Sequence, residues 1–411
     1  MANRRVGIIG GGAAGLFAGC FLKKAGVDFC ILESGNEVGR KLLLTGHGRC
    51  NITNRKAPSE LKSGYYEAGN FVYPALKKFS PDDAVAFIQD ELGVPLKEED
   101  NNRMFPVSDK ASDIRDALVR FIGEENIITE YKCVDLSKDD GTFKVASSDG
   151  RDMTFEQVIV ACGGRSFPKT GSDGSGYELA RKMGHNVTPL IPSLVAVDVC
   201  EKDREFTSGL SGVSVNAGAS LYYDNKKQTQ ETGDVLFTHR GVSGPAIMKM
   251  SRYIPRDIVS RDGWIELDFT PGRNEKEVDE ELLREMNSHG DTKLTTLASR
   301  FVPNSVANQL GKRAGVTDLY AAKVNKEQRK AYVRELKHLE LHIDNPPKYE
   351  EAYVTRGGVA LKEIKRETLE SKIVPGLWFI GEVLDVDGIS GGYNLHACMS
   401  EAFIAVANLV E

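Results

Sequence analysis

The chain has 411 residues, of which 41% are hydrophobic and 27% are charged. This length and composition exclude a disordered or fibrous protein and allow a large buried core in more than one domain. The net charge of −6 argues against binding nucleic acid through bulk electrostatics. The 41 glycines are clustered, which indicates backbone turns around a ligand rather than a collagen repeat.

The cysteines and the first apolar run indicate in which cellular compartment the protein is expected. The seven cysteines are scattered and form no C-x-x-C pair, which favours isolated thiols in a reducing compartment and no zinc or iron–sulfur site. The run at 6–22 follows two arginines, as a secretory signal would, but six glycines interrupt it. No run reaches the ~20 apolar residues that span a bilayer. The sequence therefore predicts a cytoplasmic protein with no metal and no membrane segment.

The first predicted element is an apolar strand at 6–9, followed by Gly10, Gly12 and Gly15 in a G-x-G-x-x-G turn and a buried helix. The first glycine permits the turn, the second lets a pyrophosphate approach, and the third lets helix and strand pack closely. The helix N-terminus favours the phosphate. A second apolar strand ends at Glu33, 23 residues after Gly10, where a carboxylate accepts hydrogen bonds from a ribose. This predicts a dinucleotide site but does not separate FAD from NAD.

Two further segments belong to the same predicted domain. A strand is expected at 131–136, and another buried strand runs from Val158 into Gly163 and Gly164, where the backbone can approach a ligand. The polar loop 170–176 then precedes a helix at 177–183.

The middle of the chain has a different pattern. Residues 193–272 alternate between apolar and polar, which is typical of antiparallel strands with one solvated face. Residues 273–345 carry apolar positions at helical spacing and indicate a small helical domain. We therefore predict a cofactor domain formed by 1–192 and 346–411, interrupted by these two insertions.

Near the C-terminus, a strand at 377–380 leads into Gly381 and Glu382, then into a glycine-rich turn and a helix from about Asn394. A second helix N-terminus is thereby presented to a ligand, far along the chain from the first. FAD suits both ends, with its pyrophosphate at the first helix, its ribitol near Gly381 and Glu382, and its flavin at the last helix. A tight turn before a packing helix is the alternative.

Several blocks of sequence carry a resemblance to a known family. They are GRKLLLTGHGRCNITN at 39–54, LFTHRGVSGP at 236–245, TRGGV at 355–359, GEVLDVDG at 381–388 and GGYNL at 391–395. These blocks resemble the signatures of BaiN/YhiN-type flavoproteins, also described as aminoacetone-oxidase-like FAD-binding enzymes, and they follow the family order along nearly the whole chain. The resemblance implies non-covalent FAD in an α/β fold of the glutathione-reductase type. Its Rossmann-like FAD-binding domain carries an inserted antiparallel β-domain and a small helical domain.

The resemblance also implies which residues contact FAD. It places Gly10, Gly12, Gly15 and Glu33 on the ADP half, with Val134 near the adenine. The remaining implied contacts are Arg40 and Lys41 near the diphosphate, Thr45, Gly46, Gly48 and Asn51 along the isoalloxazine, and Gly163, Gly164, Gly381, Glu382, Gly391, Gly392 and Asn394 in the rest of the shell.

Four residues are candidates for the chemistry itself, namely His47, Arg49, His239 and His396. His47 and His396 lie in blocks that the family places near the flavin, where relatives have a small residue and a Gln. His239 lies in a glycine-rich break, where an imidazole can protonate or orient a substrate, although hydrogen bonding to the loop backbone is an equal alternative. Arg49, beside a glycine, suits an anionic substrate or the reduced flavin.

Three other residues receive a structural interpretation. Cys50 has no vicinal cysteine, so packing is favoured over a redox role. His338 and His342 are four residues apart, as in a helical metal pair, but the surrounding alternation predicts a strand and a solvated surface.

The expected function is that of an FAD-dependent oxidoreductase acting on a small organic substrate at the open face of the flavin. Because one dinucleotide fingerprint is visible, NADH or NADPH would reach the flavin only transiently. We favour an NAD(P)H-fed reductase of a C=C bond or a similar acceptor, and the resemblance implies dehydro-steroid-like compounds. An O₂-dependent amine or aminoacetone-type oxidase remains open. So does a tRNA-directed or non-catalytic flavoprotein, although the acidic charge disfavours nucleic acid. The oligomeric state is not indicated.

Overall fold

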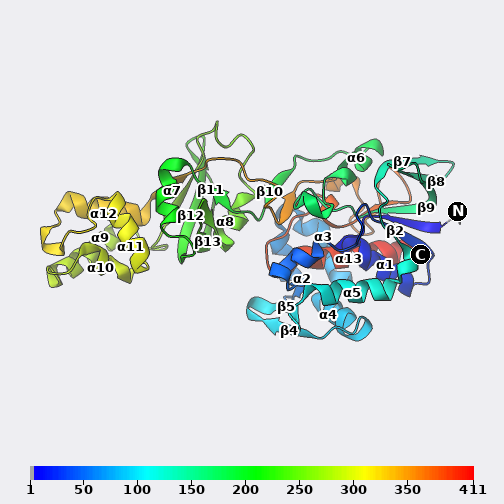
Figure 1. Ribbon diagram of the computed structural model, residues 1–411, viewed down its shortest axis with the longest axis horizontal. Coiled ribbons are helices and arrows are strands. Elements are labelled where there is room, and N and C mark those ends of the chain that lie inside the picture. Colours follow the sequence, from blue (N-terminus) through cyan, green and yellow to red (C-terminus); the bar gives the residue numbers. More distant parts are fainter. Residues whose placement is uncertain (1–3) are drawn as a thin grey trace. The chain divides into compact units, whose positions relative to one another are not determined.

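The computed structural model describes residues 4–411 and divides them into two compact units (Figure 1). The first unit contains the chain up to Leu190 together with Tyr353–Glu411, and the second is Ile191–Ala352. The chain therefore leaves the first unit once and returns to it, so both ends of the sequence contribute to one unit.

A seven-stranded sheet organises the first unit, in the order β6-β2-β1-β9-β8-β7 with β18 also beside β9. The strands are β1 (Arg4–Ile9), β2 (Phe29–Leu32), β6 (Ile127–Ile128), β7 (Cys133–Asp139), β8 (Thr142–Ser147), β9 (Asp152–Val160) and β18 (Leu377–Phe379). Strands β6, β2, β1, β9 and β18 run parallel, whereas β7, β8 and β9 pair antiparallel. Ile9 pairs with both Leu32 and Val160, and Val160 pairs with Phe379. The carboxyl ends of four strands thus meet at one edge, where open parallel sheets bind ligands.

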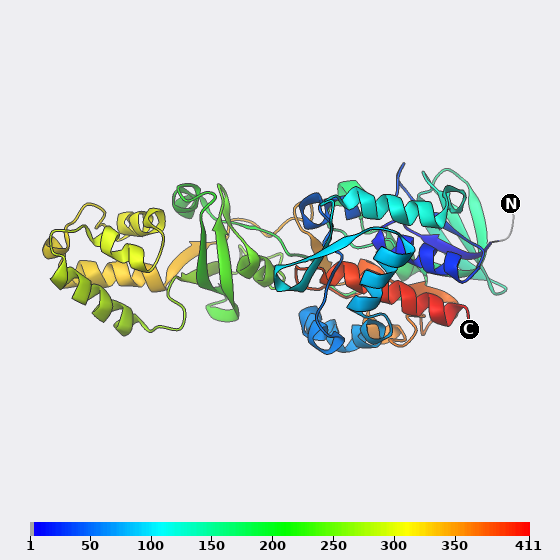
Figure 2. The same cartoon turned by 90° about the horizontal axis from the view of Figure 1, so that it is seen from below.

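The first unit also contains helices. They are α1 (Ala13–Lys24), α2 (Pro58–Leu61), α3 (Gly69–Lys78), α4 (Pro81–Ala86), α5 (Ala111–Ile122), α6 (Ser175–Lys182) and α13 (Tyr393–Leu409). Helix α1 packs against α13, the red helix beside it in Figure 2, and against α5. Both α1 and α13 are buried around most of their circumference, which is typical of helices at the centre of a domain. The two helices whose N-termini were predicted to meet a ligand are therefore direct neighbours.

A small antiparallel sheet accompanies the first unit, in the order β3-β5-β4. Its strands are β3 (Thr53–Asn54), β4 (Leu96–Glu99) and β5 (Arg103–Pro106), and a kinked turn of 3-10 helix, η1 (Leu42–Gly48), precedes it. Other short turns include η6 (Pro168–Thr170) and η10 (Gly381–Val383), and β17 (Val354–Arg356) lies where the chain re-enters this unit.

The second unit contains a six-stranded antiparallel sheet in the order β11-β14-β13-β12-β15-β16. Its strands are β11 (Val197–Asp198), β12 (Ser214–Tyr223), β13 (Lys226–Phe237), β14 (Gly241–Ser243), β15 (Trp264–Asp268) and β16 (Leu339–His342), and β10 (Ile191–Ser193) precedes them. Val215, Ala217, Ala219 and Leu221 point to one face of β12 and are buried in the core of this unit. The predicted alternation in this part of the chain is confirmed by this sheet.

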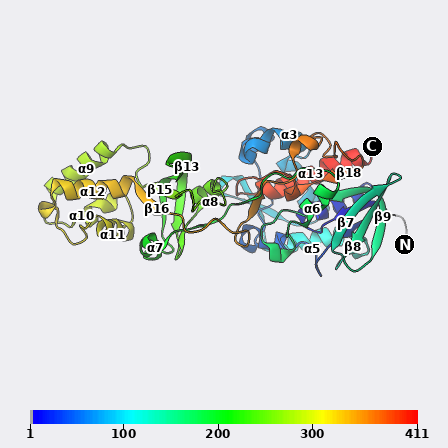
Figure 3. The same cartoon turned by 90° about the horizontal axis from the view of Figure 1, so that it is seen from above.

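Four helices gather beside one another in the second unit (Figure 3). They are α9 (Glu275–Ser288), α10 (Leu294–Leu297), α11 (Asn304–Arg313) and α12 (Lys326–Lys337), with the turn η8 (Ala321–Lys323) before the last. Asn274 caps α9 and Asn325 caps α12, each through a reciprocal capping box. Val278, Leu310 and Tyr332 fill the space between them and are 0% exposed.

Some elements differ from the sequence-based expectation. The segment 193–272 also contains the helices α7 (Glu201–Ser208) and α8 (Pro245–Ser251), which the alternating pattern did not predict. Helix α7 buries Asp203, Phe206 and Thr207, so it has little apolar periodicity to detect. His342 ends strand β16 and His338 ends helix α12, and the predicted strand at this position is confirmed.

Within residues 4–411, three features concern membrane helices, metal ligands and cysteines. No helix among these residues is long and apolar enough to cross a membrane. No group of three His, Cys, Asp or Glu side chains in this part of the chain is arranged to hold a metal ion. All seven cysteines are free thiols.

Candidate functional site

The turn between β1 and α1 gives each of its glycines a different environment. Gly10 has φ = 109°, and a Cβ there would meet the backbone of Ala161 at 2.6 Å. A Cβ on Gly15 would overlap the carbonyl oxygen of Gly10, so only glycine lets the helix pack against the turn. A Cβ on Gly12 would meet no protein atom within 4 Å. This turn is therefore tightly packed at Gly10 and Gly15 and open at Gly12.

The N-terminus of α1 is suited to an anion. Gly12 is its N-cap, no side chain caps the helix, and its first turn contains no acidic residue. The unpaired N–H groups and the positive end of the helix dipole therefore face the open side of the turn. These are the features that bind phosphate groups at helix N-termini.

Glu33 lies directly after β2 and adjoins this turn. Its carboxylate is 8% exposed and accepts hydrogen bonds from the N–H groups of Gly11 at 2.8 Å and Gly35 at 2.7 Å. The Ser34 hydroxyl donates a third hydrogen bond to it at 3.2 Å. A carboxylate has about four acceptor positions, so these bonds fix the side chain and leave some acceptor capacity for another hydroxyl group. Glu33 is thus fixed beside the glycine turn, and its role toward a ribose stays a prediction.

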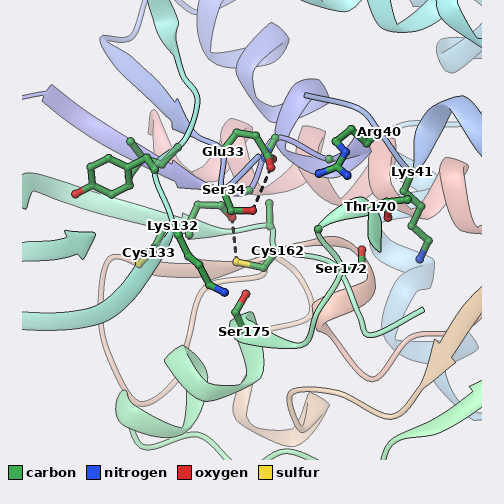
Figure 4. Close-up of a pocket in the computed structure, with 18 of the residues that line it drawn as sticks. Glu33, Ser34, Arg40, Lys41, Lys132, Cys133, Cys162, Thr170, Ser172 and Ser175 are labelled. Carbon is green, nitrogen blue, oxygen red and sulfur yellow. Dashed lines mark hydrogen bonds between the residues drawn. The ribbon is translucent and has the colours of Figure 1, made fainter. Parts of the chain in front are cut away.

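A cavity of about 610 Å³, including the solvent at its mouth, opens along the carboxyl edge of the sheet. Figure 4 shows that its side chains come from several segments distant in sequence. The lining residues are Ile9, Gly10, Gly11, Gly12, Leu32, Glu33, Ser34, Glu37, Gly39, Arg40, Lys41, Tyr131, Lys132, Cys133, Ala161, Cys162, Thr170, Gly171, Ser172, Ser175 and Leu179. The cavity therefore joins the glycine turn, Glu33 and the two basic residues after them, and an ADP group fits this combination of donors, acceptors and open space.

Sequence reasoning missed several of these lining residues. Val134, the expected adenine contact, is 43% exposed and does not line the cavity, whereas its neighbours Lys132 and Cys133 do. Ser172 and Ser175 line it from the polar loop 170–176. That loop was recognised as flexible and polar, but no local signal indicates which of its hydroxyl groups face a ligand.

Arg40 and Lys41 are both partly buried at the cavity wall. The Arg40 guanidinium donates to the carbonyl of Lys169, and the Lys41 ammonium forms a 2.7 Å ion pair with Glu382. Lys41 also donates to the hydroxyl of Ser166. These contacts connect the segment after β2 to the segments that follow β9 and β18.

Glu382 is the centre of a hydrogen-bond network. Its Oε1 accepts from the N–H of Thr355 at 2.8 Å and from the Ser166 hydroxyl at 2.7 Å, while its Oε2 takes the Lys41 ion pair. A Cβ on Gly164 would overlap this carboxylate. Gly164 is therefore required by the packing of Glu382, which organises the strand ends.

The loop 45–51 has an unusual backbone. Gly46, His47, Gly48 and Cys50 all have positive φ, between 57° and 84°. The non-glycine residues among them are strained, and such conformations cluster at ligand sites. Cys50 is 0% exposed, and burial raises the pKa of its thiol to about 12, so it is a packed, unreactive thiol.

This loop contacts the turn before α13. With its side-chain O and N assigned by hydrogen bonding, the Asn51 amide donates to the carbonyls of Thr53 and Met104 and accepts from the Gly392 N–H at 3.1 Å. Gly392 has φ = 94°, and a Cβ there would meet the backbone of Thr53 at 2.5 Å. The structure therefore brings together two segments that the sequence assigned to the isoalloxazine.

The turn itself is closed by Asn394. Its side chain accepts from the Gly388 N–H at 2.8 Å and donates to the Gly388 carbonyl at 2.9 Å. Gly391 and Gly392 both have positive φ immediately before α13 begins. Asn394 thus fixes the shape of this turn and presents the helix N-terminus.

A buried carboxyl lies behind the same turn. Glu401 of α13 is 1% exposed and accepts the N–H of Gly381 at 2.6 Å, while its second oxygen has no protein partner. Burial raises the pKa of Glu401 to about 8. No sequence motif pointed to this residue.

The catalytic candidates His47 and Arg49 of the loop 45–51 differ in how firmly other side chains hold them. His47 is exposed, and its ring lies edge-on to Tyr353 with centroids 6.4 Å apart. Arg49 stacks on Phe105 and forms ion pairs with Glu99 and Asp109. Hydrogen bonds from Arg49 and Lys97 lower the pKa values of both carboxyls. Arg49 therefore braces the small sheet, and His47 is the side chain that remains available.

The other two histidines lie elsewhere. His396 of α13 is 0% exposed, and burial lowers its pKa to about 4, so it is a neutral core residue. The structure argues against a catalytic role for His396, because a sealed imidazole cannot exchange a proton with substrate. His239 is exposed between β13 and β14 in the second unit, where the Thr238 hydroxyl, rather than the imidazole, accepts from the loop backbone.

Comparisons with known proteins identify the family. The family model described as "HI0933-like protein Rossmann domain" matches residues 4–408. A 3-dehydro-bile acid Δ(4,6)-reductase of Clostridium scindens is 30% identical over 410 residues, covering 98% of each chain. A ribosomal RNA dihydrouridine synthase of Haemophilus influenzae is 32% identical, covering 98% of this chain and 97% of the relative. The corresponding Escherichia coli protein is 31% identical over 408 residues, covering 98% of this chain and 97% of the relative.

A solved structure agrees with the fold. The 3-ketosteroid Δ1-dehydrogenase of Sterolibacterium denitrificans, in complex with 1,4-androstadiene-3,17-dione, covers all of both chains at 11% identity with a TM-score of 0.51. At that identity the likeness concerns the architecture alone. The chain thus belongs to the HI0933-like family of BaiN/YhiN type, and it is an FAD-dependent oxidoreductase with a Rossmann-like FAD-binding domain.

Proposed function

We propose that this chain uses FAD to reduce a carbon–carbon double bond conjugated with a carbonyl group, with NADH or NADPH as the transient electron donor. The observation that carries the proposal is a shared reaction type. The names of the full-length relatives describe the saturation of a C=C bond, in a dehydro-bile acid and in the uracil of ribosomal RNA. In both substrates a carbonyl activates that bond for hydride addition.

The ADP half of FAD is proposed to occupy the cavity at the first helix. The residues that would hold it are Gly10, Gly12, Gly15, Glu33, Arg40 and Lys41. The open space at Gly12 and the uncapped N-terminus of α1 support a pyrophosphate there. Glu33 would accept the ribose hydroxyls, and Lys41 would neutralise phosphate charge beside its ion pair with Glu382.

The flavin is proposed to lie along the loop 45–51 and the turn before α13. Thr45, Gly46, Gly48, Asn51, Gly163, Gly164, Gly381, Glu382, Gly391, Gly392 and Asn394 complete this proposed shell. The bond between the Asn51 amide and Gly392 supports a single shared surface for the ring. When bound, FAD supplies hydride transfer.

The chain's own residues then have distinct tasks. The N-terminal N–H groups of α13 would stabilise negative charge at one edge of the ring. Reduction of a conjugated double bond also requires a proton at the second carbon, and His47, exposed on the strained loop, is the proposed donor. Arg49 would position this loop through its ion pairs rather than contact the substrate.

Anaerobic stopped-flow absorbance tests this function. The FAD-loaded protein is mixed with NADH or NADPH, and then with a 4-ene-3-ketosteroid or a uridine-containing RNA. We expect one nicotinamide to bleach the flavin absorbance and one conjugated acceptor to restore it, with a saturated product detected by mass spectrometry. Bleaching by a small amine, with peroxide formed on admission of air, would instead establish an oxidase. Failure of both nicotinamides to bleach the protein would contradict the proposal.

A further inference from the structure

One side of helix α12 carries a row of cations. Lys326, Lys330 and Arg334 follow one another at intervals of four residues, so they share one side of the helix, and all three are exposed. Successive members are ~6 Å apart along the helix axis. Lys323, also exposed, stands just before the N-cap. We call these four residues the α12 stripe.

The α12 stripe has no structural partner within residues 4–411, since no carboxylate lies within ion-pair distance of its side chains. Neighbouring cations, in contrast, form ion pairs. Arg300 pairs with Glu281 and Glu285, Arg329 pairs with Asp279, and Lys337 pairs with Asp268. Those pairs join helices and strands to one another, whereas the stripe contributes nothing to the packing of its own unit.

Two of the acids near the stripe are neutralised by other cations. Glu335 of α12 pairs with Arg313, and Asp318 pairs with Lys293. Exposed Glu327 is the acid of α12 that has no ion-pair partner in the described part of the chain. Exposed Asp291 also has no ion-pair partner there, and it lies near the stripe because the carbonyls of its neighbours Gly290 and Thr292 accept the N–H groups of Ala322 and Ala321. The four cations of the stripe therefore outnumber two unpaired acids, which leaves a local excess of positive charge although the whole chain has a net charge of −6.

An exposed aromatic side chain lies at the end of the stripe. Tyr320 is 46% exposed, and its carbonyl accepts the N–H of Lys323, so the two residues close one turn of chain. Unpaired cations beside an exposed aromatic ring suit a phosphate backbone with unstacked bases. An acidic protein surface would pair with the cations of the stripe but would leave the Tyr320 ring without a stacking partner.

We propose that the α12 stripe, with Tyr320, is a contact surface for the phosphate backbone of structured RNA. The inference rests on the proposed reductase activity, in which the C=C bond of a uracil base is one acceptable substrate. It is supported by the relatives named as acting on ribosomal RNA. The stripe would hold the RNA without reading its sequence, because phosphate contacts position and do not specify.

Fluorescence anisotropy tests this surface. The full-length FAD-loaded protein is titrated into a fluorescein-labelled RNA hairpin with a uridine-rich loop, over a series of salt concentrations. The variant Lys326→Glu, Lys330→Glu, Arg334→Glu is compared with Lys78→Glu, Lys226→Glu, Lys362→Glu, which changes the net charge equally at exposed positions on other elements. We expect the stripe variant to lose about tenfold or more in affinity and to lower the salt slope by about 2–3, and the control to change little.

The outcomes separate this inference from the proposed function. Flavin content and reduction of a ketosteroid by the stripe variant are expected to equal those of the parent, because neither depends on RNA. Equal RNA affinity of the parent and the stripe variant would overturn the inference and leave the reductase untouched. Binding to phosphatidylglycerol vesicles instead of RNA, lost in the same variant, would also overturn it and assign the stripe to a membrane surface.

Discussion

At the scale of single residues, the three glycines of the first turn differ in whether an added side chain has space. A Cβ on Gly10 or Gly15 would meet protein backbone, whereas a Cβ on Gly12 would enter open space. Gly12 also has φ = −77°, which any residue adopts without strain. Folding therefore explains the first and third glycines of the motif but not the second. The proposed pyrophosphate, lying close to the backbone, would account for Gly12.

This contrast makes Gly12→Val a clean prediction. The valine side chain meets no protein atom near its Cβ, so the unfolding temperature of the flavin-free protein should stay close to that of the parent. FAD affinity should fall at least about 100-fold, or ~3 kcal/mol, because the side chain occupies the proposed place of the pyrophosphate. Flavin fluorescence quenching measures the affinity.

The matched control for this variant is Ala25→Val, at the exposed far end of α1. It adds a similar side chain to the same helix, away from the cavity, and should retain full flavin affinity. Equal loss in both variants would mean that α1 itself is perturbed, and no loss in Gly12→Val would place the pyrophosphate elsewhere.

The sequence predicted the local part of this site well and its distant part incompletely. The positions of Gly10, Gly12 and Glu33 at one cavity follow from spacing along one β-α-β unit, which fixes their geometry, and their roles toward FAD stay predictions. The cavity position of Lys132 and the ion pair of Lys41 with Glu382 depend on how remote strands pair in the sheet. No short-range pattern carries that information.

At the scale of elements, helix α13 holds a titratable group in its interior. Glu401 is fully buried and bonded to the Gly381 N–H, and its pKa is about 8 in the folded protein, against an ordinary value of 4.5. Between these values the folded chain holds a proton that the unfolded chain has released. The contribution of Glu401 to stability is therefore complete below about pH 4.5 and is lost as the pH rises through 8.

The variant Glu401→Gln should remove this dependence. Glutamine keeps an acceptor for the Gly381 N–H and does not titrate, so its unfolding temperature relative to the parent should rise from pH 5 to pH 9. Calorimetry or circular dichroism measures the two curves. Glu350→Gln, at an exposed position, serves as the control and should run parallel to the parent. A parallel curve for Glu401→Gln would show that the buried carboxyl does not titrate in this window.

Elements with strong periodicity were predicted closely. The apolar strand expected before Glu33 matches β2, and the helical spacing expected within 273–345 is seen in α9. Helix α7 was missed because Phe206 is its one buried apolar side chain, and α8 was missed because its seven residues are too few to establish a helical period. The burial of His396 was also missed, since a histidine inside the all-round apolar helix α13 has the same local sequence as one facing a ligand.

At the scale of the whole molecule, one cofactor unit is assembled from both ends of the chain, and the second unit is inserted between them in the sequence. The seven-stranded sheet needs β18 from the C-terminal segment to complete the edge at which the cavity opens. The net charge of −6 averages over this arrangement and conceals the positive side of α12. Composition alone therefore described the chain as acidic. The α12 stripe is recognised only when the charges are placed on helices.

The most direct test of the account is the flavin stoichiometry of the gently purified chain, measured from its absorbance spectrum and by titration of the flavin-free protein with FAD. We predict one FAD per chain, released intact by acid because it is bound without a covalent link. A chain that neither retains nor rebinds FAD, or that binds it equally well in the Gly12→Val variant, would contradict the assignment of the two helix N-termini to a single cofactor.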